Sequence, residues 1–469
     1  MSVHKRRPLR VAVVGAGPAG IYAADILTKS EDLLAGSSIF SDTPVSIDLF
    51  ERLPAPYGLI RYGVAPDHPR IKQIVHALQR VLEKPQIRLL GNVHYGLDIT
   101  LEDLRRHYDA VIFSTGASKD RDLEIPGIRL PGSYGAADFV SWYDGHPDVP
   151  REWPLTARSV AVLGVGNVAL DVARILAKPA DELLSTEIPD NVYRGLAASQ
   201  VTDVHVFGRR GPAQAKFTPL ELRELDHSPS VEVLVYPEDI EFDDGSMTAI
   251  HSSNQVRQVV KTLQDWAIRD PGNRPRRLHL HFLHRPVEVL GEGGVTGLRT
   301  ERMELDGNGG ARGTGVFHDW DVQAVYRAVG YLGSHLADLP FDHSSGTVPH
   351  DAGRVLGQDG QQVPGCYVTG WIKRGPVGLI GHTKGDALET VGSLLSDLPT
   401  LREATEPDPA AILDLLERRD IRYTTHEGWN RLDVHELRLG DERGRERIKV
   451  VSREEMLAIS RDELIPVQP

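Results

Sequence analysis

The chain has 469 residues, more than one hydrophobic core supports, so we expect two or three domains. Its formal net charge of −13 argues against a general nucleic-acid binder, whose surface would be basic. The single cysteine, Cys366, excludes an internal disulfide, a Cys-x-x-Cys redox pair and a cysteine-ligated zinc or iron–sulfur centre. The basic residues 1–10 run directly into a strand pattern without a signal peptide's apolar segment, and no stretch approaches the roughly 18 apolar residues of a membrane span. The cytoplasm is therefore the expected location.

The first predicted unit, residues 11–30, is a strand, a glycine turn and a helix. Gly15, Gly17 and Gly20 fit G-x-G-x-x-G, in which glycines allow a tight turn and close approach of the backbone to a pyrophosphate. The helix N-terminus would hold that pyrophosphate. The next strand ends at Glu51, which suits a ribose diol although it lies about ten residues beyond the usual spacing. This pattern predicts a nucleotide site; a glycine-rich turn without a ligand is the alternative.

Further strand patterns follow along the chain. Residues 109–117 form a short apolar strand, and residues 159–210 repeat the order strand, glycine turn, helix and strand. Two later strands, within 324–330 and 365–371, also end in small residues, and the second leads into a helical pattern. Short strands alternating with helices predict parallel sheets covered by helices, an α/β fold. The repeated unit indicates either two copies of one domain or one nucleotide domain inserted into another.

The second glycine turn points to a different nucleotide. Gly164, Gly166 and Ala169 fit G-x-G-x-x-A, and the following strand leads to Arg209 and Arg210 where an NAD site would have an acid. Guanidinium groups bind phosphate oxygens in bidentate fashion, so the pair suits a ribose 2′-phosphate. The pattern predicts NADP(H) rather than NAD(H); a solvated pair of charges is the alternative.

Two nucleotide sites of opposite charge in one chain predict NADPH and FAD, with hydride passing from nicotinamide to flavin. A flavin accepts two electrons together and releases them singly. The chain would therefore link a two-electron donor to one-electron carriers or to another substrate.

Five motifs together resemble the adrenodoxin reductase family of ferredoxin–NADP reductases, and its bacterial, FprA-type branch in particular. They are the stretches 56–69 (PYGLIRYGVAPDHP), 166–176 (GNVALDVARIL), 208–212 (GRRGP), 221–225 (ELREL) and 370–381 (GWIKRGPVGLIG). The resemblance covers nearly the whole chain. It implies a glutathione reductase-like fold with two Rossmann-like domains. An FAD domain of residues 1–116 and 331–469, ending in a helical region, would be interrupted by an NADP domain of residues 117–330.

The resemblance also implies cofactor contacts. For FAD these are Ala19, Glu51, Leu59, the region of Tyr95, Trp371, Gly378, Leu379 and Ile380. Further expected cofactor contacts are Gly15, Gly17, Pro18 and Gly20 of the first glycine turn, and Thr115 and Gly116 at the end of an apolar strand. For NADP they are Val165, Gly166, Asn167, Val168, Arg209, Arg210, Glu221 and again Gly378. Because Gly378 serves both, the loop after Trp371 is expected where nicotinamide meets flavin. This chain departs from the family in having Val377 where threonine is usual, which could alter how the nicotinamide is held, and Tyr95 where smaller residues are common.

His68 and Glu224 resemble a pair that the family places near the nicotinamide. Hydride transfer needs no nucleophile, so the expected role of both residues is orientation and charge tuning. Asp171 is a further candidate for the same environment. The alternatives are a loop histidine held between prolines for His68 and an ordinary helix residue for Asp171.

Without an internal dithiol, the expected electron acceptor is another protein, a ferredoxin-type iron–sulfur protein. A basic cluster comprises Arg257, Lys261, Arg269, Arg274, Arg276 and Arg277. It would suit an acidic ferredoxin, and ordinary solvated charge remains the alternative. The predicted activity is NADPH:ferredoxin oxidoreductase. An NADPH oxidoreductase acting on quinones or small acceptors and a non-enzymatic redox-sensing flavoprotein stay open.

Overall fold

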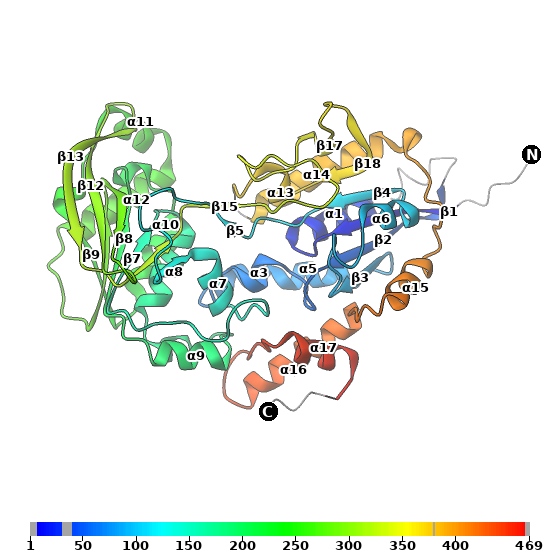
Figure 1. Ribbon diagram of the computed structural model, residues 1–469, viewed down its shortest axis with the longest axis horizontal. Coiled ribbons are helices and arrows are strands. Elements are labelled where there is room, and N and C mark those ends of the chain that lie inside the picture. Colours follow the sequence, from blue (N-terminus) through cyan, green and yellow to red (C-terminus); the bar gives the residue numbers. More distant parts are fainter. Residues whose placement is uncertain (1–6, 31–39, 379, 465–469) are drawn as a thin grey trace, which may run out of the picture.

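The computed structural model describes residues 7–30, 40–378 and 380–464, which form two lobes (Figure 1). The first lobe contains a seven-stranded sheet in the order β16-β17-β18-β4-β1-β2-β3. Its strands are β1 (Arg7–Val14), β2 (Phe40–Glu51), β3 (Ile87–Gly91), β4 (Ala110–Phe113), β16 (His350–Asp351), β17 (Arg354–Leu356) and β18 (Gln362–Val368). Strands from both ends of the chain therefore share one sheet.

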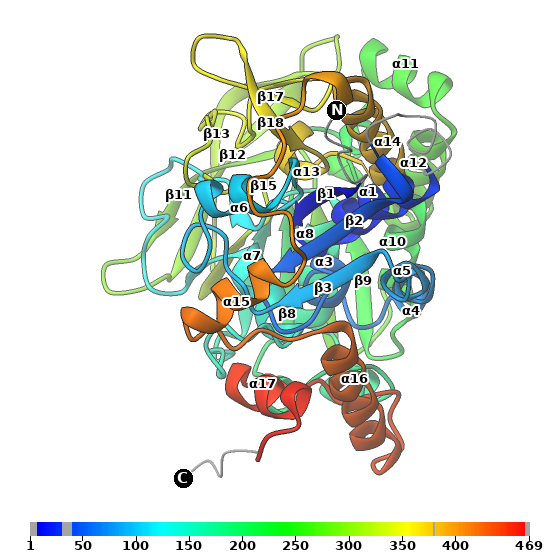
Figure 2. The same cartoon turned by 90° about the vertical axis from the view of Figure 1, so that its right-hand side faces the viewer.

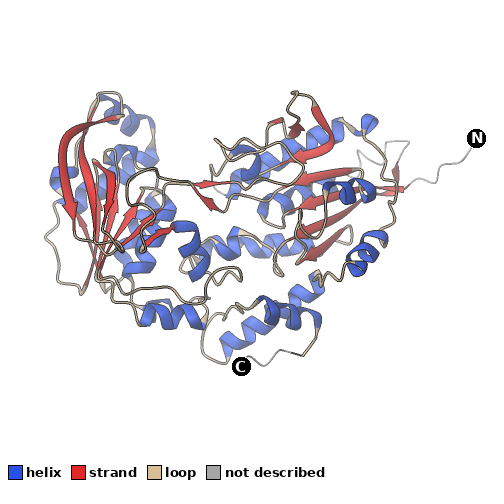
Figure 3. Ribbon diagram, viewed as in Figure 1, coloured by secondary structure: helices blue, strands red, loops and turns tan. Residues whose placement is uncertain are grey.

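Five successive strands of this sheet, β18, β4, β1, β2 and the edge strand β3, pair in parallel. Their apolar residues are buried on both faces, as parallel strands require. One face packs on α1 (Pro18–Lys29), α5 (Ile74–Leu82) and α14 (Ile380–Ser396). The other face packs on α6 (Leu101–His107) and α15 (Ala411–Arg418). Figure 2 shows α1, α5 and α14 on one side of the strands and α6 and α15 on the other, and Figure 3 shows the helices and strands of both lobes.

The second lobe is built on a six-stranded parallel sheet in the order β6-β14-β7-β8-β10-β9. Its strands are β6 (Ser133–Gly135), β7 (Ser159–Leu163), β8 (Asp203–Phe207), β9 (Val231–Val235), β10 (Arg276–His281) and β14 (Ala324–Arg327). One face is covered by helices, with α7 (Ala136–Tyr143), α8 (Asn167–Ala177), α10 (Pro219–Glu224) and α12 (Asn254–Ala267) contributing to the core. The other face is covered by the antiparallel sheet of β11 (His284–Leu290), β12 (Gly297–Leu305) and β13 (Ala311–Trp320).

The chain passes between the lobes at a pair of short antiparallel strands. In β5 (Lys119–Asp120) and β15 (Tyr331–Leu332), Asp120 pairs with Tyr331. The second lobe is thus inserted into the first, and the predicted α/β fold with two parallel-sheet units is confirmed. Among the described residues, no helix has the length and apolar run needed to cross a bilayer.

A C-terminal strap, residues 426–463, joins the two lobes and contains α16 (His426–Asp441) and α17 (Arg453–Arg461) (Figures 1 and 2). Glu436 of the strap is buried and pairs with Arg61 of the first lobe, Oε2 lying 2.9 Å from Nη1. Lys449 Nζ lies 2.7 Å from Glu187 Oε1 of the second lobe and donates to the carbonyl of Arg61. The strap therefore fixes one lobe against the other through buried charges.

Candidate functional site

The first glycine turn lies where β1, β2 and β4 end together at the carboxyl edge of the first sheet. Gly15 has φ 109°, and an added Cβ would lie 2.6 Å from the carbonyl oxygen of Ser114, so other residues do not fit. The amide of Ala16 donates to Glu51 Oε2 over 2.9 Å. Burial raises the pKa of Glu51, and the amides of Ala16 and Leu53 act in the opposite direction. Glu51 thus stands beside the turn, as the sequence predicts.

Three further segments close around this turn. The amide of Tyr57 donates to the carbonyl of Ala16 over 2.8 Å, which brings Leu59, the first residue of α3 (Leu59–Tyr62), near the turn. An added Cβ on Gly370 would lie 2.6 Å from the Ala19 side chain, so Trp371, the first residue of α13 (Trp371–Arg374), lies near the start of α1. An added Cβ on Gly116 would meet no described atom within 4 Å. The backbone there is open, and the arrangement fits a dinucleotide with its ribose at Glu51.

The remaining predicted FAD contacts are the region of Tyr95 and the loop after Trp371. The Tyr95 ring packs in the core against Phe113, with 5.0 Å between centroids, and its hydroxyl donates to the carbonyl of Ala337. A side-chain contact from Tyr95 to a flavin would have to break that bond. Gly378 is exposed, Leu379 lies outside the described residues, and Ile380 begins α14 although its side chain is not described.

The second glycine turn has the same construction in the second lobe. Gly164 has φ 135°, and an added Cβ would lie 2.2 Å from the carbonyl oxygen of Ala328. Gly166 is the N-cap of α8, and a Cβ there would meet nothing within 4 Å. Asn167 Oδ1 accepts from the amide of Thr218 over 2.9 Å, which ties the turn to the start of α10. Val165 and Val168, on either side, are half-buried. An uncapped helix N-terminus behind an open backbone fits a pyrophosphate.

Three cationic side chains follow this turn. Arg209 is exposed and Arg210 half-buried just after β8, and neither forms an ion pair among the described residues. Lys216 is exposed and equally without a described ion pair, and its amide donates to the carbonyl of Val165 over 2.8 Å. Glu221 forms no ion pair with them among the described residues, and its carboxylate accepts from the Thr218 hydroxyl. Sequence reasoning missed Lys216 because its position beside the turn depends on a tertiary backbone bond.

His68, Asp171 and Glu224 meet between the lobes. His68 lies in the first-lobe loop before α4 (Pro69–Lys72), whereas Asp171 and Glu224 come from α8 and α10. His68 Nε2 lies 2.8 Å from Asp171 Oδ1, and His68 Nδ1 lies 2.9 Å from Glu224 Oε2. His68 and Asp171 are buried and Glu224 is half-buried. The structure thus brings together the three residues predicted near the nicotinamide.

Sequence reasoning missed a second layer of charges around His68. Arg174 of α8 binds Asp67 in bidentate fashion, with two bonds of 2.8 Å, and Lys178 lies 2.7 Å from the same carboxylate. These cations hold the pKa of Asp67 far below its usual range despite burial. The Asp67–Arg174 pair links the two lobes beside His68. The only sequence signal for them is proximity to Asp171: Arg174 lies on the same helix, and Lys178 is the C-cap of that helix.

The charge of His68 follows from these contacts. Burial disfavours the imidazolium, but Asp171 and Glu224 outweigh it and raise the pKa of His68 from 6.5 to about 9. Arg174 Nη2 also lies 2.8 Å from Nε2. A protonated ring donates to Asp171, so the contact with Arg174 is repulsive and lowers the pKa. The site therefore holds a cationic imidazole at neutral pH between two carboxylates.

The elevated pKa of His68 predicts a pH-dependent contribution to stability. The folded protein holds the His68 proton up to about pH 9 and the unfolded chain only to about 6.5. The contribution is therefore complete below pH 6.5 and is lost as pH rises through 9, a change of about 3 kcal/mol in the free energy of unfolding. In urea unfolding at several pH values from 6 to 10, the difference between wild type and His68→Gln should shrink accordingly. Curves that stay parallel would contradict the assignment.

The predicted basic cluster is largely occupied by contacts within the second lobe. Arg269 Nη1 lies 2.8 Å from Asp226 Oδ2, and Arg277 Nε lies 2.7 Å from Asp203 Oδ1. Arg274 binds the carbonyls of Ser228 and Val231, and Arg276 binds those of Ala177 and Lys178 at the end of α8. Arg257 and Lys261 of α12 form no ion pair among the described residues. These two retain the charge that a partner surface needs.

Comparisons with known proteins place this arrangement among flavoprotein reductases. The family profile for pyridine nucleotide-disulphide oxidoreductases matches residues 9–206. The chain is 40% identical over 465 residues to NADPH-ferredoxin reductase FprA of Mycobacterium tuberculosis, covering 97% of this chain and 99% of that one. It is 37% identical over 473 residues to the mitochondrial NADPH:adrenodoxin oxidoreductase of Arabidopsis thaliana, covering 96% and 95%. The solved structure of Mycobacterium tuberculosis FprA in complex with NADPH is similar, with a TM-score of 0.88 and 40% identity, covering 97% of this chain and 100% of that one.

Proposed function

Since this chain belongs to the family of NADPH-ferredoxin and NADPH:adrenodoxin reductases, we propose that it passes electrons from NADPH through FAD to a ferredoxin-type iron–sulfur protein. The observation that carries the proposal is the pair of glycine turns with opposite charge. The first has the buried carboxylate of Glu51 at its edge, and the second is followed by the unpaired cations Arg209, Arg210 and Lys216.

Each lobe supplies one part of the reaction. The first lobe, residues 1–116 with 331–469, holds FAD through the turn at Gly15 and through Glu51. The second lobe, residues 117–330, holds NADP(H) at the turn at Gly164. When bound, FAD supplies a two-electron acceptor that can release electrons one at a time. The paired strands β5 and β15 support these domain limits, because they mark where the chain crosses between the sheets.

His68, Asp171 and Glu224 lie at the boundary between the lobes and position the nicotinamide. The cationic imidazole, held by two carboxylates, keeps the loop at 65–68 in a fixed relation to α8 and α10. The Asp67–Arg174 pair fixes the same loop from the other side. Orientation of this kind is what hydride transfer requires of the protein, since the reaction uses no nucleophilic side chain.

The partner side of the proposal rests on α12. Arg257 and Lys261 lie one turn apart, and a pair of unpaired cations would attract an acidic ferredoxin. The predicted encounter is transient and weakens with salt. We place the reaction in the cytoplasm.

An anaerobic visible-absorption titration with NADPH and NADH in parallel, followed by turnover with a ferredoxin and cytochrome c, tests the proposal. NADPH should bleach the flavin band at a far lower concentration than NADH, and reduction of cytochrome c should stop when ferredoxin is omitted. Failure of a flavin band to appear even after FAD is added would overturn the flavoenzyme. Rapid reduction of quinones or of cytochrome c without ferredoxin would favour the small-acceptor alternative. Flavin reduction without turnover would favour a redox sensor.

A further inference from the structure

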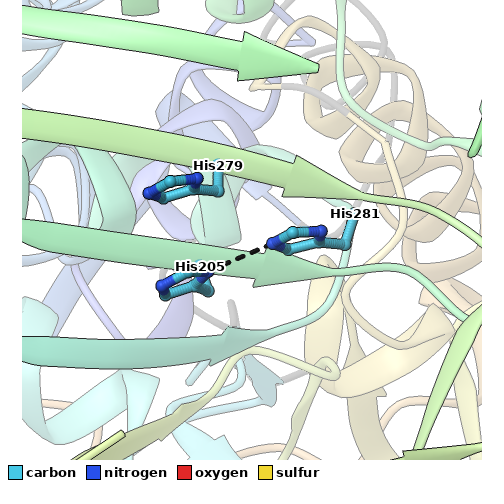
Figure 4. Close-up of side chains that lie close together, drawn as sticks. All are labelled: His205, His279 and His281. Carbon is cyan, nitrogen blue, oxygen red and sulfur yellow. Dashed lines mark hydrogen bonds between the residues drawn. The ribbon is translucent and has the colours of Figure 1, made fainter. Parts of the chain in front are cut away.

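Three histidines lie together on one face of the second-lobe sheet. Of the predicted cofactor contacts, only Arg209 and Arg210 are close to any of them in sequence. His205 is on β8, and His279 and His281 are on the neighbouring strand β10 (Figure 4). The parallel register pairs His279 with His205, and side chains two residues apart on a strand share a face. This is the face covered by β11, β12 and β13, where Trp320 lies 4.5 Å from the His281 ring. His279 and His281 are buried and His205 is half-buried.

The ring nitrogens are spaced for a metal ion. One nitrogen from each of the three rings can be chosen so that all lie within 4.8 Å of one another. His205 Nδ1 and His281 Nε2 are 3.1 Å apart and form a hydrogen bond. A tetrahedral Zn²⁺ with Zn–N distances of about 2.0–2.1 Å holds its ligand nitrogens roughly 3.3 Å apart. The rings are stacked nearly parallel, with 4.2 Å between the centroids of His205 and His279 and 7° between their planes. An ion can therefore replace that hydrogen bond once the rings turn so that their lone pairs converge on it.

Acidic and phenolic groups behind the rings would orient them. Asp239 Oδ2 lies 3.8 Å from His281 Nδ1, which is too far for a hydrogen bond, but its charge favours a proton on Nδ1. That tautomer leaves the Nε2 lone pair facing His205. His279 contacts the Tyr236 hydroxyl through Nδ1, at 2.7 Å, and Asp203 Oδ1 through Nε2, at 3.1 Å. On binding an ion, His279 exchanges one of these contacts and keeps the other as its orienting bond. Carboxylates behind imidazole ligands are the usual outer layer of zinc sites.

We propose that His205, His279 and His281 bind one divalent transition-metal ion, with Zn²⁺ as the best-fitting ion. Imidazole nitrogens suit Zn²⁺, whereas Mg²⁺ and Ca²⁺ take oxygen ligands. Three protein ligands leave a fourth position for water on the half-buried side of His205. The ion cross-links β8 to β10, and β8 leads directly to Arg209 and Arg210. Its expected effect is to stabilise the strand that precedes those arginines, and this inference does not depend on the proposed activity.

Zinc binding to the full-length, untagged chain tests the proposal. After removal of metal with a chelator, calorimetric titration with ZnCl₂ should show one site, and the ion should raise the melting temperature of the protein. His205→Gln and His279→Gln should each raise the dissociation constant for zinc by about tenfold or more. His251→Gln, an exposed histidine on α11 (Asp244–Ser252) of the same lobe, should bind zinc like wild type. The proposal would be overturned if wild type bound no zinc, or if His205→Gln and His279→Gln bound zinc as tightly as His251→Gln does.

Two further measurements guard against a folding artefact. Circular dichroism of each variant separates loss of a ligand from loss of the fold, and His205→Gln is the gentler change because that ring is half-buried. Zinc-edge X-ray absorption of wild type with one equivalent of zinc needs no variant. Imidazole ligands at about 2.0–2.1 Å support the site, and a six-coordinate oxygen shell overturns it.

Discussion

Replacing Arg209 and Arg210 together by alanine is expected to lower kcat/KM for NADPH by about 10²–10⁴-fold while changing that for NADH little. The two guanidinium groups have no ion pair among the described residues, so a 2′-phosphate would be their charged partner. Each charge-assisted hydrogen bond to phosphate contributes about 1.5–3 kcal/mol, and NADH lacks that phosphate. Steady-state kinetics with ferricyanide as acceptor measure both coenzymes without involving the protein partner. The ratio of the two kcat/KM values is the quantity to compare.

The matched control is Arg312→Ala, which removes an exposed arginine of β13 in the same lobe. Its partner is the exposed Glu304, and a surface pair of this kind contributes little. NADPH and NADH kinetics of this variant should equal those of wild type. An unchanged preference for NADPH in the double arginine variant would show that the 2′-phosphate is recognised elsewhere. Lys216→Ala, which removes the third cation at this turn, would then be the variant to measure.

The parts of the fold that depend on local pattern could be predicted from the sequence. Gly15 and Gly164 need positive φ and have backbone where a Cβ would stand, so their spacing before a helix identifies both turns. Glu51 was found because it ends the strand that follows the first turn. Residues 31–39, which supply most of the excess spacing before it, lie outside the described part of the chain.

What the sequence could not supply depends on tertiary contacts. Lys216 stands beside the second turn through a bond from its amide to the carbonyl of Val165. In the sequence nothing indicates that Arg269 and Arg277 have partners, but in the fold they form ion pairs with Asp226 and Asp203. The Tyr95 side chain lies in the core because its hydroxyl finds the carbonyl of Ala337, far along the chain. The order of charged residues in a sequence does not show which of them form ion pairs in the fold.

The same limit applies to the histidines of the second lobe. His205 is separated from His279 and His281 by about seventy residues, and their strands are neighbours only because β10 pairs with β8. Within β10, the alternation His-x-His indicates one shared face of a strand. The third histidine, His205, joins the other two only because β8 lies next to β10 in the sheet. The order of strands in a sheet cannot be read from the periodicity of the sequence.

Glu436→Ala is expected to destabilise the attachment of the strap by about 3–5 kcal/mol, because it leaves the buried Arg61 charge without its carboxylate. The Glu436 side chain is fully buried, Oε2 also lies 3.2 Å from Arg447 Nη1, and Oε1 accepts from the amide of Val450. Two cations and one backbone donor thus lose their acceptor in a single change. Denaturant unfolding should show an earlier transition, and limited proteolysis should cut between residues 426 and 463 before the lobes.

The contribution of charge, as opposed to lost volume, can be separated with two more variants. Glu427→Gln removes an exposed acid of α16 that pairs with Arg431, so it should change stability by less than about 0.5 kcal/mol. Arg61→Met combined with Glu436→Leu replaces both buried charges by apolar groups, which is often neutral and should recover much of the loss. If Glu436→Ala equals Glu427→Gln, the pair does not hold the strap. If the double variant is as unstable as Glu436→Ala, the defect lies in Arg447 and the Val450 amide, whose acceptor is still missing, rather than in the unpaired Arg61.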